Sequence, residues 1–312
     1  MAQLREMTTG LQFPEGPVAM DDGSVLVVEI KRGTLTRVKT DGKQQIIANV
    51  GGGPNGAAIG PDGACYICND GGFEWMEMDG MTLPGHTPHN YTRGSIQRVD
   101  IGTGKVEVLY TQCDGHALKG PNDIVFDKHG GMWFTDFGKT SERSRDRTGV
   151  FYAKTDGSFI KEVVFPMDGP NGIGLGPDDK MLYVAETFTA RVWQWEVAGP
   201  GELKRTAGVG GPLLEGPGGA TLLTGVPGYQ LFDSLAVDAE GWVSVATIIN
   251  GGITSISPDG KKVEHMALPD PITTNICFGG KDMRTAYATL SATGKLVAYD
   301  APRAGLRLNF NA

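Results

Sequence analysis

The chain has 312 residues, a length that excludes a small disulfide-stapled scaffold and allows a large buried core. With 28 Lys and Arg residues against 36 Asp and Glu residues, the formal net charge is −8, so we expect neither a nucleic acid nor an anionic membrane surface as a partner. The sequence has no apolar run long enough for a transmembrane helix and no recognisable leader at its N-terminus, and we therefore expect a cytoplasmic protein.

A pair of short apolar strands joined by a tight turn recurs six times along the chain. The 47 Gly and 18 Pro residues make up about a fifth of the sequence, against roughly 12% on average, which is typical of many tight turns. The six pairs span residues 15–29, 55–69, 122–136, 171–186, 233–247 and 275–289. A third strand is expected within residues 34–42, 95–100, 149–157 and 252–260, and a fourth within residues 44–48, 105–110 and 262–266.

This repeat predicts an all-β fold, a six-bladed β-propeller with four antiparallel strands in each blade. The closest copies start 40 residues apart, at residues 15 and 55, and a four-stranded blade takes about 40–50 residues. We expect a single domain over residues 1–312, closed into a ring because an open ring would leave edge strands bare. Residues 3–8 and residues 306–310 compete to supply the outer strand of blade six, and the sequence does not decide between them.

Three longer intervals between the repeats contain insertions, at residues 71–93, 138–147 and 202–229. Insertions in propellers fall into loops on the faces of the ring, where ligands bind. Each is equally well explained as an ordinary surface loop.

The residue that opens each inner strand is expected at the mouth of the central channel. All six of these residues are carboxylates or carboxamides: Glu15, Asn55, Asn122, Asn171, Asp233 and Asn275. Any single Asn or Asp is explained by turn formation, because its side chain bonds the local backbone. Six that point toward one axis form an oxygen cage, and Ca²⁺ takes 6–8 oxygen ligands. No His or Cys shares the repeated position, which argues against a dedicated zinc site.

Four short motifs resemble the SMP-30/gluconolactonase/luciferin-regenerating-enzyme family over essentially the whole chain. They are Glu15-Gly16-Pro17, Gly120-Pro121-Asn122-Asp123, Pro170-Asn171-Gly172 and Asp233-Ser234. The resemblance implies a six-bladed propeller that binds a divalent cation through Glu15, Asn171 and Asp233. It implies that Asn122 contacts the substrate or joins the metal ligands. Asn55 and Asn275 match no usual ligand of the family, and we place them only as channel-lining groups, Asn55 being a candidate substrate contact.

A cation held in this way would polarise an ester carbonyl, so we expect a metal-dependent hydrolase that opens a lactone. Aldonolactones are the substrates that the resemblance implies, whereas an apolar lid over the site would favour more hydrophobic lactones. Asp233 and His116 are candidate bases, and His89, in the first insertion, is a candidate substrate contact. We expect strand alternation to turn Asp123 away from the channel mouth. An exposed loop position without a role in the site is the simpler explanation for each histidine.

Two other functions fit the same residues. Paraoxonases and squid-type diisopropylfluorophosphatases have a similar cage, but the region that would carry the histidine of the latter type, residues 288–293, contains none here. A propeller that binds Ca²⁺ or a small molecule without catalysis is the other alternative. We expect Ca²⁺ as the cofactor, with Zn²⁺, Mn²⁺ or Mg²⁺ as alternatives, and a monomer or small homo-oligomer.

Overall fold

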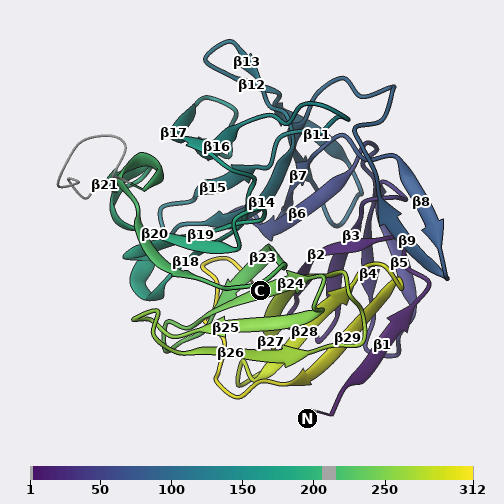
Figure 1. Ribbon diagram of the computed structural model, residues 1–312. Helices are drawn as coiled ribbons and strands as arrows, with labels where there is room; N and C mark the ends of the chain where they lie inside the picture. The colour runs from purple at the N-terminus through teal and green to yellow at the C-terminus, as the bar shows by residue number, and fades with distance from the viewer. Residues whose placement is uncertain (1–2, 206–215, 312) are drawn as a thin grey trace.

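The computed structural model describes residues 3–205 and 216–311, which form a six-bladed β-propeller (Figure 1). Its sheets are antiparallel and follow one another around a central axis. The helical elements within the described ranges are two short 3-10 turns, η1 (Pro177–Asp179) and η2 (Pro217–Gly219). The all-β propeller predicted from the repeat is therefore confirmed.

The strands follow the predicted order, and each sheet has its first strand at the channel. Blades one to three contain β2 (Pro14–Ala19), β3 (Val25–Glu29), β4 (Thr34–Val38), β5 (Gln44–Asn49); β6 (Pro54–Ile59), β7 (Cys65–Asn69), β10 (Ser95–Val99), β11 (Val106–Tyr110); and β14 (Pro121–Phe126), β15 (Gly131–Asp136), β16 (Thr148–Lys154), β17 (Ile160–Met167). Blades four to six contain β18 (Pro170–Leu175), β19 (Met181–Glu186), β20 (Arg191–Gly199), β21 (Glu202–Lys204), β22 (Thr221–Gly225); β23 (Leu231–Val237), β24 (Val243–Ile248), β25 (Gly252–Ile256), β26 (Val263–Ala267); and β27 (Thr273–Gly279), β28 (Thr285–Leu290), β29 (Lys295–Asp300), β1 (Arg5–Thr9).

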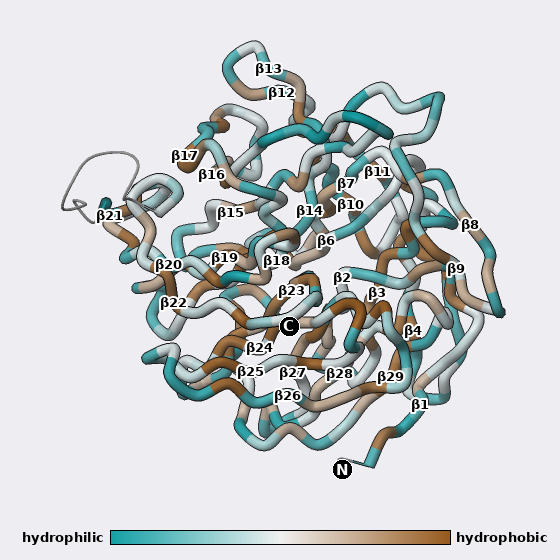
Figure 2. Tube along the Cα trace, in the orientation of Figure 1, coloured by the Kyte–Doolittle hydropathy of each residue, from teal (hydrophilic) through white to brown (hydrophobic). Residues whose placement is uncertain are grey.

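The core is divided among the contacts between blades. In the described residues, six clusters of buried apolar side chains each join two neighbouring blades. Trp133 of β15 and Trp195 of β20, for example, lie in the cluster between blades three and four. Hydrophobic stretches run along the strands, whereas the connecting turns are more hydrophilic (Figure 2). This continuous packing fixes where the inner strands begin, and so fixes the channel mouth.

The N-terminal segment closes the ring. Strand β1 pairs with β29, from Arg5 opposite Ala298 to Thr9 opposite Lys295. The competing C-terminal segment instead crosses the centre of the ring (Figure 1), where Leu306 donates its backbone N–H to the Val237 carbonyl. The ring of Phe310 packs on Phe126 of blade three, with centroids 6.0 Å apart. Residues 306–310 therefore do not supply the outer strand of blade six.

The predicted insertions occupy different places. Residues 71–93 include a hairpin, β8 (Trp75–Met78) and β9 (Met81–Pro84), whose Thr82 N–H bonds the Ala292 carbonyl of blade six. A smaller hairpin, β12 (Gln112–Cys113) and β13 (His116–Ala117), precedes blade three. Within residues 202–229, β22 pairs with β20 as an outer strand of blade four, and residues 206–215 lie outside the described residues. A search of the described residues for a helix long and apolar enough to cross a membrane finds none.

Candidate active site

Five of the six residues that open the inner strands meet in one cavity. Its volume is about 440 Å³, and its lining includes Glu15, Asn55, Asn122, Asn171 and Asp233. Each side chain comes from the first residues of an inner strand in a different blade, from β2, β6, β14, β18 and β23. The predicted convergence at the channel mouth is thus present for these five residues.

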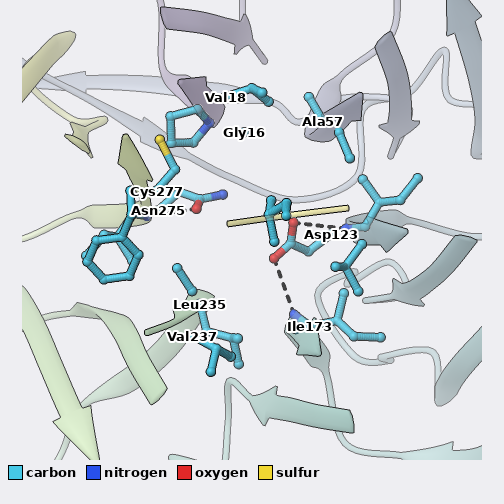
Figure 3. A pocket seen from close by; sticks show the side chains of 18 of the residues that line it. Gly16, Val18, Ala57, Asp123, Ile173, Leu235, Val237, Asn275 and Cys277 are labelled. Atoms are coloured by element: carbon cyan, nitrogen blue, oxygen red, sulfur yellow. Dashed lines mark hydrogen bonds between the residues drawn. The ribbon is translucent and has the colours of Figure 1, made fainter. Parts of the chain in front are cut away.

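Asn275, the sixth residue, lines a smaller cavity deeper in the channel (Figure 3). Its Nδ2 donates a 2.7 Å hydrogen bond to Oε2 of Glu15. The preceding residue, Thr274, lines the larger cavity in its place. Because successive side chains of a strand point to opposite faces, one step along β27 separates the two positions.

Glycine follows three of the cavity residues and allows the inner strands to approach one another closely. A Cβ at Gly16 would lie 2.6 Å from the carbonyl oxygen of Asn55 in the next blade. A Cβ at Gly56 would lie 2.4 Å from the carbonyl oxygen of Asn122, and one at Gly172 would lie 2.7 Å from that of Asp233. These distances are shorter than any normal contact. The glycines are therefore part of what draws the polar side chains of separate blades together.

Burial raises the pKa of both cavity carboxyls. Loss of solvent raises the pKa of Asp233 to about 8, an effect that the nearby Asp123 reinforces and a hydrogen bond from Asn171 opposes. Loss of solvent, followed by the negative charge of Asp233, raises the pKa of Glu15 well above its usual value. Two carboxylates buried at one site repel each other, and a cation between them removes that cost.

Two amide oxygens at the site lack a hydrogen-bond donor. The Oδ1 atoms of Asn55 and Asn122 are buried and unpartnered, although buried polar atoms in proteins are almost always paired. Oδ1 of Asn171 has only a 3.4 Å contact from the Ser234 hydroxyl. Carboxylate and amide oxygens are the ligands that Ca²⁺ prefers, so these residues fit a divalent cation. In the described residues no three His, Cys, Asp or Glu side chains gather as a metal site, and a cation here would depend on amide oxygens.

Asp123 of β14 lines the smaller cavity (Figure 3), whereas the preceding residue, Asn122, lines the larger one. Its carboxylate accepts hydrogen bonds from the backbone N–H groups of Ile124, at 2.9 Å, and Ile173, at 3.3 Å. Burial raises its pKa to about 7. The lower cavity, of about 70 Å³, is lined mainly by apolar residues and is closed in part by Leu306 and Leu308 of the C-terminal segment. Asp123 is therefore turned away from the site, as strand alternation predicts.

The two histidines assigned a role from the sequence do not line the cavity. His116 is exposed on β13, on the small hairpin that precedes blade three. His89 is also exposed, with Nε2 3.4 Å from a carboxylate oxygen of Glu74. Loop position alone did not indicate how far either side chain lies from the channel. The structure gives no geometric support for His116 as a base or for His89 as a substrate contact.

An ion pair next to the cavity was not anticipated from the sequence. Lys139, in the second insertion, places Nζ 3.2 Å from Oδ1 of Asp70, and both side chains are buried. The other oxygen of Asp70 accepts a 3.2 Å hydrogen bond from Nδ2 of Asn55. The amide of Asn55 is thereby oriented with its Oδ1 left free. Several Lys and Arg residues share this insertion, so composition did not single out Lys139.

Comparison with known proteins agrees with this architecture. A gluconolactonase of Zymomonas mobilis is 26% identical over 300 residues, covering 88% of this chain and 75% of the relative. The lactonase drp35 of Staphylococcus haemolyticus is 26% identical over 262 residues, covering 83% of this chain and 70% of the relative. The structure of a Xanthomonas campestris gluconolactonase superposes with a TM-score of 0.74 at 20% identity, over 96% of this chain and 90% of that one.

A calcium-binding regucalcin of Agrobacterium tumefaciens has the same fold, with a TM-score of 0.76 at 16% identity over 100% of this chain and 98% of that one. The family model described as SMP-30/Gluconolactonase/LRE-like region matches residues 13–292, which is most of the chain. The chain belongs to this family.

Proposed function

We propose that the protein is a hydrolase that opens lactones with the help of a divalent cation, Ca²⁺ in the first instance. The observation that carries the proposal is the meeting of two buried carboxylates and two unpartnered amide oxygens at the floor of one cavity. Relatives named gluconolactonase and lactonase, and a fold neighbour named as a calcium-binding protein, support it.

Glu15, Asn171 and Asp233 would hold the cation, with Asn122 as a fourth ligand or a substrate contact. When bound, a divalent cation polarises an ester carbonyl and stabilises negative charge on its oxygen. The buried position of the carboxylates supports this assignment, because a cation balances the two charges that burial otherwise disfavours.

Asp233 is the best candidate for the base. Glu15 and Asp233 are the ionisable side chains that line the cavity in the described residues. Oε2 of Glu15 already accepts hydrogen bonds from the Gly16 N–H and from Asn275. The proton that water loses on attacking the carbonyl would therefore go to Asp233. The ring C–O bond then breaks, and Asp233 would return this proton to the leaving oxygen, which gives the hydroxy acid and restores the base.

Lactone hydrolysis followed with a pH indicator, with excess Ca²⁺ or with EDTA, tests the proposal. We expect activity that EDTA abolishes and Ca²⁺ restores, and a loss of at least about a hundredfold in Asp233→Asn. Asp238→Asn is the matched control. Asp238 is a buried carboxylate that directly follows β23, the strand that contains Asp233, and it pairs with Arg303. Cleavage of triaryl or aryl dialkyl phosphates far faster than of any lactone would assign a phosphotriesterase. Tight Ca²⁺ binding without hydrolysis of either class would assign a binding protein.

A further inference from the structure

We propose that the substrate is a neutral lactone with an apolar substituent, an alkyl chain or a fused aromatic ring, rather than a polyhydroxylated sugar lactone. This inference rests on the proposed lactonase function and specifies its substrate class. It comes from the walls of the cavity, whereas the proposed function comes from its floor.

The walls are apolar and are contributed by many parts of the ring. Phe73 and Leu83 belong to the first insertion, and Phe137 and Phe188 follow the second strands of blades three and four. Ile249 of blade five and Ile272 of blade six continue the wall. The rings of Phe137 and Phe188 pack together with centroids 5.4 Å apart. A volume of about 440 Å³ lies within the usual range for small-molecule sites, which is about 300–1,000 Å³.

Three of the four threonine hydroxyls in the lining, those of Thr87, Thr187 and Thr274, form hydrogen bonds with other protein groups. Thr187 accepts a 3.1 Å hydrogen bond from Nδ2 of Asn171, and Thr87 donates a 2.9 Å hydrogen bond to the Thr140 carbonyl. The Thr274 hydroxyl lies 2.5 Å from that of Ser291 and 2.9 Å from that of Thr289. A sugar lactone would bury several hydroxyls, and each one left without a partner weakens binding. The wall therefore disfavours a polyhydroxylated ring.

No cationic side chain in the described residues lines the cavity. The Lys139 ammonium is directed to Asp70 and to the Gly72 carbonyl, the latter at 2.8 Å. The Arg145 guanidinium pairs with Asp168 and lies 3.8 Å from the ring centroid of Phe188, without joining the lining. Apart from the proposed cation at the floor, which would face the lactone carbonyl, a carboxylate or phosphate on the substrate would find no cationic partner in the lining, which points to a neutral molecule.

The apolar lining of the cavity continues to its rim, where the side chains are partly exposed. The lining residues Met76, Phe188 and Ile249 have exposed fractions of 54%, 37% and 44%. They come from the β8–β9 hairpin, blade four and blade five. An apolar group attached to the lactone ring would cover these side chains and gain the free energy of removing their surface from water.

The test compares kcat/KM for unsubstituted δ-valerolactone, its alkyl-substituted series, dihydrocoumarin and glucono-δ-lactone, with the Ca²⁺-loaded protein. We expect kcat/KM to rise about fourfold for each added methylene group, mainly through KM, until the chain leaves the rim. Phe188→Ser should lower kcat/KM more for each longer substrate. Phe159→Ser, which removes a comparably exposed ring outside the cavity, should leave the chain-length dependence unchanged.

A binding measurement tests the substrate class separately from the proposed lactonase activity. Alkyl-substituted δ-lactams resist hydrolysis, and their binding can be followed by calorimetry. We expect their Kd to fall with chain length in the wild-type protein and less so in Phe188→Ser. A flat response to chain length, or glucono-δ-lactone as the better substrate, would overturn the substrate class while leaving a lactonase. Hydrolysis of no lactone at all would remove the function and the inference together.

Discussion

Nζ of Lys139 lies 3.2 Å from Oδ1 of Asp70, and the two side chains are only 6% and 3% exposed. The pair joins the second insertion to blade two, and the Lys139 ammonium also lies 4.4 Å from the ring centroid of Phe73 in the cavity wall. Removing one partner would leave an uncompensated buried charge. This pair therefore holds the first insertion against blade three while it orients Asn55.

A double-mutant cycle tests the importance of that pair. We expect Asp70→Asn to lower the free energy of unfolding by about 3–5 kcal/mol, and the Asp70→Asn/Lys139→Met double variant to recover much of it. Urea unfolding followed by tryptophan fluorescence gives these values. The cycle for Asp178 and Lys180, whose side chains are both 73% exposed, should show little coupling. Additive losses at Asp70 and Lys139 would contradict the interpretation.

Gly16 offers a test of the close approach between inner strands. Gly16→Ala combines a backbone φ of +49° with a Cβ 2.6 Å from the Asn55 carbonyl oxygen. We expect it to lower the free energy of unfolding by about 3 kcal/mol and to weaken Ca²⁺ binding, because it displaces Glu15. Gly51→Ala is the control, with φ of +69° but nothing within 4 Å of the new Cβ, and should cost about 1 kcal/mol. Equal losses in the two variants would show that backbone conformation alone is responsible.

Calcium titration calorimetry tests the ligand assignments one by one. We expect Glu15→Gln and Asp233→Asn each to weaken Ca²⁺ binding by at least about a hundredfold, and Asn55→Ala to weaken it less. Glu29→Gln is a matched control, since Glu29 is a fully buried glutamate of the same blade that bonds Thr34 and Thr36. Small and similar losses at Glu15, Asp233 and Asn55 would argue against a cation site.

Removing the metal should make the free energy of unfolding decrease as the pH rises. Burial raises the pKa of Asp233 to about 8 and that of Glu15 above its usual range, so the metal-free folded state binds protons more tightly than the unfolded chain. This tighter proton binding stabilises the metal-free folded protein most at low pH, and the stabilisation falls as the pH rises toward 8. Ca²⁺ favours the charged carboxylates. We expect calcium to stabilise the protein by about 2 kcal/mol more at pH 8.5 than at pH 5.5.

The measurement is urea unfolding at several pH values with EDTA or with excess Ca²⁺. The difference between the two curves isolates the cavity carboxyls from other titrating groups. Asp233→Asn should flatten that difference. A calcium effect that shrinks as the pH rises would contradict the site.

Local sequence was enough to predict the six pairs of inner strands and five cavity residues. Period-two alternation and Gly-containing turns act over a few residues, so Glu15, Asn55 and Asn122 could be placed at strand starts and at the channel mouth. The prediction for blade six was wrong by one residue. Thr274, and not Asn275, lines the larger cavity, and Asn275 lines the smaller one. A one-residue shift sends a side chain to the other face of the sheet.

Features that depend on distant contacts could not be predicted in this way. Whether the side chains of His116 and His89 extend to the channel depends on where their loops pack. The residues next to them in the sequence do not determine that packing. Lys139 and Asp70 are 69 positions apart and meet only in the folded ring. The choice between the two chain ends for blade six likewise rests on partners at the opposite end of the chain.

The pairing of β1 with β29 has a consequence for biosynthesis. Residues 5–9 are made long before their partners at residues 295–298. Blades one to five can pair their strands as they emerge, but blade six must wait until β29 has been made. The outermost strand of the sixth sheet therefore stays unmatched until the five other blades have been made, and its pairing with β29 completes the circle.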